Sequence, residues 1–367
     1  MTTKPTVVVA MSGGVDSSVA AALLVEQGYR VIGMMLRLWS EPEAESANRC
    51  CSPDAMAMAR RIAAILSIPF YVLDAREYFF KEVVQPFIDD YAHNLTPNPC
   101  INCNRLIRWE FLFKHALSVG ADFLATGHYA RIHQLPDQTY QLLRGVDLSK
   151  DQSYVLHVLS QNHLRHTMFP LGEMVKSEVR SLAHRFNLPV AEKADSQDLC
   201  FLGADRNYHA FLARHAPQSL NPGLIVDLQG ITLGYHQGLP LYTIGQRKGL
   251  KIANPTPLYV IKKDAIKNVL FVGREDALGC RSLRTIKTNW INGNPPDAPL
   301  ECQVKVRYKA RDAAGVVNKT DADSFQMDFN NPIRDITPGQ AAVLYNGEVC
   351  LGGGIIVDEN KNQLVEE

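Results

Sequence analysis

The sequence predicts an α/β fold: a doubly wound parallel sheet in the N-terminal part, then a small central domain and a C-terminal β-barrel. Apolar runs alternate with helical segments through the first half of the chain, the order that builds parallel sheets. Beyond Pro222 the helix signals fade, Gly and Pro become frequent, and short alternating runs indicate β-strands. A length of 367 residues accommodates two or three domains. We place them at residues 1–205, 206–278 and 279–367.

The N-terminal elements follow from apolar runs and the residues that flank them. Apolar runs predict buried parallel strands at residues 6–10, 29–36, 70–74 and 122–126. Helical spacing predicts helices at 19–25, 53–66 (with Pro53 in the first turn), 75–93 (interrupted at Pro86) and 104–120 (ending at Gly120). The carboxyl ends of parallel strands share one edge, so we expect the loop 12–18, Asp74 and the segment 126–128 to lie there.

The remaining elements are mostly β-structure. We predict a hairpin over residues 131–144 that turns at Pro136-Asp137, a helix opening at Lys150 and another over 172–186. Strands of the later domains are predicted at 258–261, 269–272, 302–308 and 341–344. The acidic tail after Val357 is predicted to be surface-exposed or disordered.

Composition limits the class of protein. No run of about 18 apolar residues occurs, so we expect no membrane span. The N-terminus leads directly into the first strand without a signal-peptide core, which predicts a cytoplasmic protein with mostly reduced cysteines. The net charge is zero, but residues 240–311 carry 14 Lys and Arg against 5 Asp and Glu. This basic band is either a phosphate-binding face for RNA or a solvated surface.

The loop at residues 12–18 reads SGGVDSS and joins the first strand to the first helix. Its backbone N–H groups, its hydroxyls and the helix N-terminus suit an anion. It lacks both the Gly-Lys-Ser/Thr of a Walker loop and the dinucleotide fingerprint. The pattern resembles the PP-loop of the ATP pyrophosphatases, which cleave ATP to AMP and pyrophosphate while adenylating a substrate. An ordinary Gly-rich turn is the alternative.

Three cysteines are candidates for chemistry. Cys100 and Cys103 form a CxxC motif just before the predicted helix 104–120, where a helix dipole lowers a thiol pKa and favours a nucleophile. A metal or Fe–S ligand pair and two inert thiols are the alternatives. Cys200, between two apolar residues, is either a core cysteine or a catalytic one that the fold brings to Cys103.

Other candidates have weaker signals. Cys50-Cys51 lies in a polar loop and, with the CxxC motif, would complete a four-cysteine zinc site, although adjacent cysteines share a tetrahedral site poorly. His128 is either structural or near the nucleotide. Basic segments that contact phosphate or are merely exposed are Arg307-Tyr308 and 245–249. The cysteines expected to be structural are Cys280, Cys302 and Cys350.

Seven motifs occur in order: SGGVDSS, TPNPCINCN, ATGHYAR, KDQSYVL, DSQDLCF, YTIGQRKGL and TPGQAAVLYNGEVCLGGG. With them the chain resembles the tRNA-specific 2-thiouridylases from residue 10 to residue 355. The resemblance implies a PP-loop domain, a small central domain and a β-barrel, the last two binding tRNA. It implies a cytoplasmic sulfurtransferase that uses ATP and Mg²⁺ to adenylate the C2 carbonyl oxygen of the wobble uridine in tRNAs for Lys, Glu and Gln. A cysteine persulfide then replaces AMP.

The resemblance also assigns residues. ATP would be held by Ala10, Met11, Ser12, Gly13, Gly14, Val15, Asp16, Ser17, Leu36 and Gly127, with Leu36 standing where the family often has Met. tRNA would be contacted by Asn98, Pro99, Cys100, His128, Lys150, Asp151, Gln152, Arg307, Tyr308 and Gln340. Cys200 would carry the persulfide and Cys103 would resolve it as a disulfide. We expect a monomer whose partners are tRNA and a cysteine desulfurase or sulfur-relay protein.

Cys100 departs from the family pattern, since many members carry Asp there, seen as a general acid/base. Either the thiol substitutes for that Asp, or Cys100, Cys103 and Cys200 bind a [4Fe–4S] cluster; we favour the persulfide relay, with all three as catalytic residues. Two rival functions are weaker. A PP-loop enzyme acting on a small molecule leaves the basic band unexplained, and a tRNA-binding protein without catalysis leaves the PP-loop and the cysteines unexplained.

Overall fold

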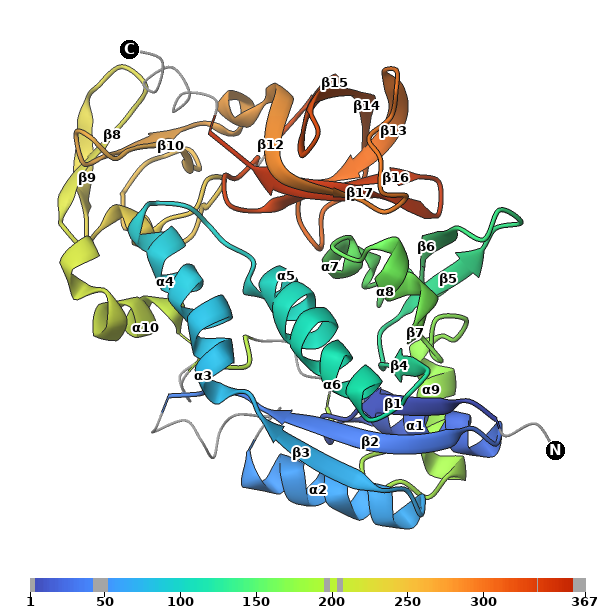
Figure 1. Ribbon diagram of the computed structural model, residues 1–367. Helices are drawn as coiled ribbons and strands as arrows, with labels where there is room; N and C mark the ends of the chain where they lie inside the picture. The colour runs from blue at the N-terminus through green and yellow to red at the C-terminus, as the bar shows by residue number, and fades with distance from the viewer. Residues whose placement is uncertain (1–3, 42–51, 195–198, 203–206, 335, 359–367) are drawn as a thin grey trace.

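The N-terminal part of the chain is built on a five-stranded parallel sheet, as predicted. A computed structural model describes residues 4–41, 52–194, 199–202, 207–334 and 336–358 (Figure 1). The sheet has the order β3-β2-β1-β4-β7, and every neighbouring pair is parallel. Its strands are β1 (Thr6–Ala10), β2 (Arg30–Arg37), β3 (Phe70–Asp74), β4 (Phe123–Ala125) and β7 (Thr167–Met168). The last was not predicted, because two residues carry no periodic signal.

Helices cover both faces of this sheet, as the alternation of side chains along β1 requires. Val7 and Val9 point into a cluster with α1 (Val15–Glu26), α2 (Pro53–Ile65) and α9 (Lys176–Arg185). Val8 points to the opposite face and packs in a cluster with Trp109. Successive side chains of a strand face opposite ways, so one Val run supplies both halves of the core.

The predicted helix over 75–93 is present, but Pro86 does not interrupt it. The segment runs through α3 (Arg76–Phe79), a π-helical stretch η2 (Phe80–Val84) and α4 (Gln85–Ala92). A proline ring clashes with the carbonyl four residues earlier in an ordinary α-helix. Here the wider π turn immediately before Pro86 accommodates the ring, so the chain stays helical.

The helix after the CxxC motif begins earlier than the sequence predicted. It starts with α5 (Pro99–Asn102) and continues through the π-helical η3 (Cys103–Leu112) and α6 (Phe113–Ser118). Pro99 takes the first helical position and Asn98 caps the helix, its Oδ1 accepting from the Cys100 N–H at 3.1 Å. Cys100 and Cys103 therefore lie inside the first turns of the helix, not ahead of it.

The predicted hairpin over 131–144 is confirmed as β5 (Ala130–Gln134) and β6 (Tyr140–Arg144). The strand with which this hairpin pairs was not predicted from the sequence. Strand β6 pairs with β17 (Val349–Ile356), so the hairpin extends the sheet of the C-terminal domain. Between the hairpin and α9 lie the short helices α7 (Ser153–Leu156) and α8 (Gln161–Arg165).

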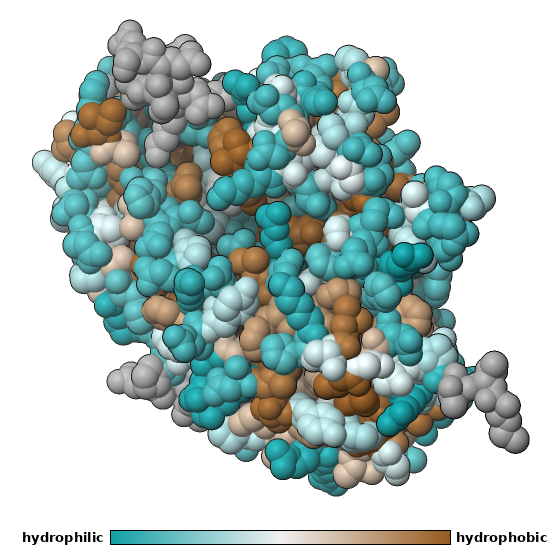
Figure 2. Space-filling model, in the orientation of Figure 1, coloured by the Kyte–Doolittle hydropathy of each residue, from teal (hydrophilic) through white to brown (hydrophobic). Residues whose placement is uncertain are grey.

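The central domain begins with α10 (Tyr208–His215) and contains a four-stranded sheet of order β10-β11-β8-β9. Its strands are β8 (Gly223–Val226), β9 (Thr232–His236), β10 (Tyr259–Asp264) and β11 (Val269–Gly273). Ile231 and Tyr235 are among the exposed side chains of this domain. Figure 2 shows hydrophobic residues, in brown, on the side of the molecule where Figure 1 places β8 and β9. Its inner side packs with α4 in one cluster that contains Phe87 and Phe211.

The C-terminal domain is the predicted β-barrel. Strand β12 pairs with β15 at one side and with β17 at the other, which closes the sheet on itself. The strands are β12 (Cys280–Trp290), β13 (Leu300–Lys305), β14 (Ala313–Asp321), β15 (Ser324–Ile333), β16 (Ala341–Asn346) and β17. Buried side chains such as Val304, Phe325 and Met327 fill the interior. Within the described residues, no helix is long and apolar enough to cross a membrane.

Arg144 joins the barrel to the first domain. Its guanidinium lies 2.8 Å from the Asp312 carboxylate and 3.7 Å from the centre of the Tyr345 ring. The Arg144 side chain is only 10% exposed and that of Asp312 is 36% exposed, so the ion pair is partly shielded from water. Both contacts fix the hairpin against the barrel beside the strand-end edge of the parallel sheet.

Candidate active site

The PP-loop is a tight turn between β1 and α1. Gly13 has φ +65°, and a Cβ there would lie 2.5 Å from the Ala55 carbonyl oxygen of α2. A Cβ on Gly127 would lie 2.7 Å from the backbone of Asp16 and Ser17. Because both residues are glycines, the backbone of the PP-loop can approach the backbone of α2 and of the segment after β4 closely. The predicted strand-end position of the loop is confirmed, and so is that of Gly127, just beyond β4.

Three side chains to which the sequence analysis gave no role contact the PP-loop. Lys176 Nζ lies 2.6 Å from Asp16 Oδ1, and the Tyr129 hydroxyl donates to the same oxygen at 2.9 Å. Lys193 Nζ donates to the Gly13 carbonyl oxygen at 2.9 Å. These residues come from segments far along the chain, and no local pattern marks them as neighbours of the loop.

His128 follows Gly127 just beyond the end of β4, and its side chain is buried in a group of hydrogen-bonded residues. Its Nε2 is 3.0 Å from Arg108 Nη1 and its Nδ1 is 2.7 Å from Thr126 Oγ1. A guanidinium only donates, so Nε2 accepts and Nδ1 carries the proton. Burial, together with the Arg108 charge, holds the His128 pKa well below its usual value, so the ring is neutral. Arg108 also donates to Asn104 Oδ1 at 2.6 Å, which links β4 to the cysteine-bearing helix.

Cys103 and Cys200 border the same apolar cluster. Both are half-buried and pack against a core that includes Phe79 and Phe201, whose rings meet edge to face with centroids 6.0 Å apart. Leu36, at the end of β2, borders the same cluster. Since β2 is the neighbour of β1, the cluster connects the strand-end edge to both thiols.

No metal centre is formed by the described part of the chain. Cys100 is exposed, and no group of three His, Cys, Asp or Glu there is placed to hold a metal ion. The [4Fe–4S] alternative at Cys100, Cys103 and Cys200 is therefore not supported. The suggested zinc site at Cys50-Cys51 lies outside the described residues.

The remaining cysteines are in the barrel domain. Burial raises the pKa of Cys302 to about 11 and that of Cys350 to about 12. Such thiols stay protonated and inert near neutral pH, which agrees with the structural role predicted for them. Cys280 differs, because it is exposed at the first residue of β12.

All three domains meet beside the N-cap of the cysteine helix. The Thr96 N–H donates to the Pro338 carbonyl at 2.9 Å, and Gln340 Nε2 donates to the Thr96 carbonyl at 2.7 Å. Arg307 Nη2 is 3.4 Å from both the Thr337 hydroxyl and the Ile244 carbonyl of the central domain. The fold thus brings Asn98, Pro99 and Cys100 near Arg307 and Gln340.

Tyr308 lies at the same junction. Burial raises its pKa, with smaller contributions from the charges of Asp151 and Cys100. Asp151 itself is buried, and its Oδ1 accepts from the N–H groups of Gly145 and Ser153 at 3.1 Å each. Gln152 Oε1 accepts from the Tyr129 N–H at 3.1 Å. Two side chains of the segment 150–152 are thus bonded within the fold, and tRNA contact there stays a prediction.

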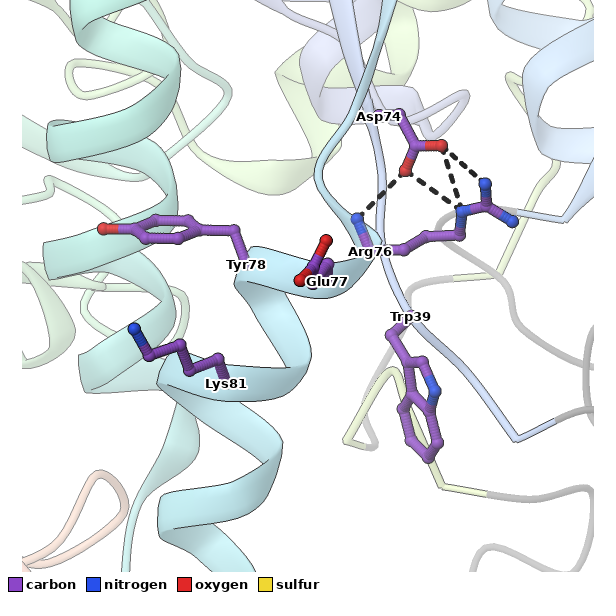
Figure 3. Close-up of a pocket in the computed structure, with 6 residues that line it drawn as sticks. All are labelled: Trp39, Asp74, Arg76, Glu77, Tyr78 and Lys81. Atoms are coloured by element: carbon purple, nitrogen blue, oxygen red, sulfur yellow. Dashed lines mark hydrogen bonds and ion pairs between the residues drawn. The ribbon is translucent and has the colours of Figure 1, made fainter.

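A cavity of about 670 Å³ opens at the end of β3 (Figure 3). Its lining residues are Trp39, Asp74, Arg76, Glu77, Tyr78 and Lys81. Asp74 is at the strand end as predicted, but its carboxylate pairs with Arg76 Nη2 at 2.6 Å, and the hydrogen bonds from Arg76 lower the Asp74 pKa to about 2. In the sheet, β2 lies between β3 and β1, and Trp39, which follows β2, also lines the cavity.

Three protein-family models together span most of the chain. They are described as a tRNA methyl transferase HUP domain (residues 5–204), a tRNA methyl transferase PRC-barrel domain (209–274) and an aminomethyltransferase β-barrel domain (280–356). Among solved structures, a 4-thiouridine synthetase–RNA complex with bound ATP covers 58% of this chain and 51% of its own, at 18% identity and a TM-score of 0.37. That likeness is too slight to bear on function.

Curated relatives match over nearly their whole length. The tRNA-specific 2-thiouridylase MnmA of Magnetococcus marinus is 48% identical over 97% of this chain and 100% of its own. The protein of the same name from Chloroflexus aurantiacus is 46% identical over 95% and 98%, and that of Heliobacterium modesticaldum is 47% identical over 96% and 93%. Together with the PP-loop, the three domain models and the strand-end geometry, these matches show that the chain belongs to the tRNA-specific 2-thiouridylase family.

Proposed function

We propose that this protein is a tRNA-uridine 2-sulfurtransferase that thiolates the wobble uridine of tRNAs for Lys, Glu and Gln at the expense of ATP. The observation that carries the proposal is the apolar cluster shared by Cys103, Cys200 and Leu36. It connects two thiols to the strand-end edge where the PP-loop lies, so activation of a base and sulfur transfer can occur in one crevice. Membership of the family supports the same activity.

The first step is adenylation. ATP would lie in the PP-loop, where Gly13 and Gly127 leave the space that a Cβ would fill. Mg²⁺ would neutralise phosphate charge next to the Asp16 carboxylate. The uridine C2 oxygen attacks the α-phosphorus, and the bond to the bridging oxygen breaks, its electron pair leaving on pyrophosphate. The C2 oxygen thereby becomes part of AMP, a good leaving group.

The second step is sulfur transfer. The terminal sulfur of a persulfide on Cys200 attacks C2 and displaces AMP, so a disulfide bond joins the base to Cys200. The Cys103 thiolate then attacks the Cys200 sulfur, forming a Cys103–Cys200 disulfide and releasing the 2-thiouridine. A dithiol reductant restores the thiols, and a cysteine desulfurase or sulfur-relay protein reloads Cys200. Cys100, exposed near the helix N-terminus, would exchange protons with the base in place of Asp.

The tRNA would bind along the junction of the three domains. Asn98, Arg307 and Gln340 are close together there, and Tyr308 offers a ring for stacking a base. The basic band of residues 240–311 contributes phosphate contacts from the central domain and the barrel. His128, which the resemblance assigned to tRNA contact, is buried, so it would act on the site by holding Arg108 rather than by touching the tRNA.

The test is incubation with unmodified tRNA, ATP, cysteine and a cysteine desulfurase, followed by nucleoside mass spectrometry. We expect 2-thiouridine with wild-type protein, none with Cys200→Ser, and unchanged tRNA affinity for that variant. Asp16→Ala should stop pyrophosphate release. Unchanged thiolation by Cys200→Ser would refute the persulfide role. Binding of tRNA with no pyrophosphate release by the wild type would favour a non-catalytic tRNA-binding protein instead.

A further inference from the structure

Two lysines at the PP-loop have no part in the steps above. Lys176 opens α9 and reaches Asp16 Oδ1 at 2.6 Å, with a side chain only 13% exposed. Lys193, beyond the end of α9, donates to the Gly13 carbonyl at 2.9 Å. Both ammonium groups therefore lie at the cradle where an anion is expected to bind.

Both lysines stand on a rigid support. The Lys176 N–H donates to Asp147 Oδ2 at 3.0 Å, and α9 packs against α1 through buried Val179 and Ala183. Arg180 Nη1 donates to the Ala191 carbonyl at 2.8 Å, and its Nη2 donates to the Lys193 carbonyl at 3.3 Å. These bonds fix the backbone of each lysine relative to the loop, so their charges are positioned before any ligand arrives.

Asp16 has a second hydrogen-bond partner, which allows Lys176 to leave Asp16 for a bound phosphate. The Tyr129 hydroxyl donates to the same carboxylate oxygen at 2.9 Å, so Asp16 keeps a hydrogen bond when the lysine leaves it. Lys176 and Lys193 thus bring two ammonium groups to the PP-loop, one on the Asp16 carboxylate and one on the Gly13 carbonyl. A polyphosphate bound in the loop would bring negative charge to both groups.

We propose that Lys176 is a ligand of the β- and γ-phosphates of ATP, that Asp16 holds it in place until ATP binds, and that Lys193 adds a second positive charge beside Gly13. The inference rests on the proposed use of ATP. When the α–β bridging bond breaks, negative charge grows on the departing pyrophosphate, and a fixed ammonium stabilises it. Lys176 keeps its proton throughout and acts by charge alone.

The test compares Lys176→Met with Lys176→Arg, with Arg185→Met as the matched control. Arg185 lies on the same helix in an exposed ion pair with Glu26. Calorimetry would measure the affinity for ATP and for AMP, and a coupled assay would measure pyrophosphate release. We expect Lys176→Met to slow release about a hundredfold, the usual loss when one transition-state donor is removed. Its ATP affinity should fall about tenfold or more with AMP affinity unchanged, while Lys176→Arg retains most activity.

Three outcomes decide the matter. A selective loss of ATP affinity over AMP affinity supports the proposal. Equal losses for both nucleotides would mean that Lys176 only shapes the loop, and no loss would mean that it is not a ligand; either result overturns it. If Lys176→Met does not fold, the same ATP-to-AMP comparison in Lys193→Met decides. The comparison of ATP and AMP affinities can be made even if the wild type thiolates no tRNA. Failure of the proposed function can therefore be distinguished from failure of the lysine proposal.

Discussion

Gly127→Ala should displace the PP-loop. The added Cβ would lie 2.7 Å from the Asp16 carbonyl carbon and the Ser17 nitrogen, whereas ordinary contacts begin at 3.4 Å. Backbone on both sides must therefore separate by about 0.7 Å, and overpacking of this kind costs about 2 kcal/mol. If ATP binds only after this strain has been overcome in the PP-loop, the ATP affinity falls about 30-fold, since each 1.4 kcal/mol of binding free energy changes an affinity about tenfold.

Calorimetric titration with ATP would measure this loss. Gly234→Ala is the matched control, because a Cβ there meets only an Ile252 side-chain carbon at 4.0 Å and the position lies in β9 of the central domain. We expect wild-type ATP affinity for the control. If Gly127→Ala bound ATP as tightly as the wild type and melted at the same temperature, the close approach of the two backbones would be refuted.

Three further predictions concern stability and reactivity. Arg144→Met should lower the free energy of unfolding in urea by about 2–3 kcal/mol, because it leaves a partly shielded carboxylate unpaired and removes a ring contact. Iodoacetamide at pH 8 should leave Cys302 and Cys350 unmodified in the native protein, since pKa values of about 11 and about 12 leave few thiolates; mass spectrometry of peptides would show any labelling. Burial lowers the pKa of His157 to about 4. Between about pH 6.5 and 4, His157 is therefore protonated in the unfolded chain and neutral in the folded protein. His157 should therefore contribute a loss of stability of up to about 3 kcal/mol as pH falls through that window, and His157→Gln should reduce the fall in urea titrations. Buried His128 adds a loss of the same sign, so part of the fall should remain in that variant.

Local patterns in the sequence were sufficient for much of the fold. The strand β3 was predicted at its observed bounds, 70–74, and the hairpin at 131–144 is present, because apolar alternation and turn residues act over a few neighbours. The helix containing Cys100 began earlier than predicted, since its start depends on the Asn98 cap. Pro86 was taken as a break, although a π turn accommodates it.

The sequence by itself determined the PP-loop, the parallel sheet around it and the candidate cysteines, because motif chemistry and periodicity are local properties. Only the tertiary structure decided which distant groups meet that loop. Tyr129, Lys176 and Lys193 reach it because β4 pairs with β1 and α9 packs against α1. Likewise, the hairpin joins the barrel because β6 pairs with β17, a contact between segments with no shared sequence signal. Such long-range contacts form because buried surfaces must match across the whole core, and no single segment encodes that match.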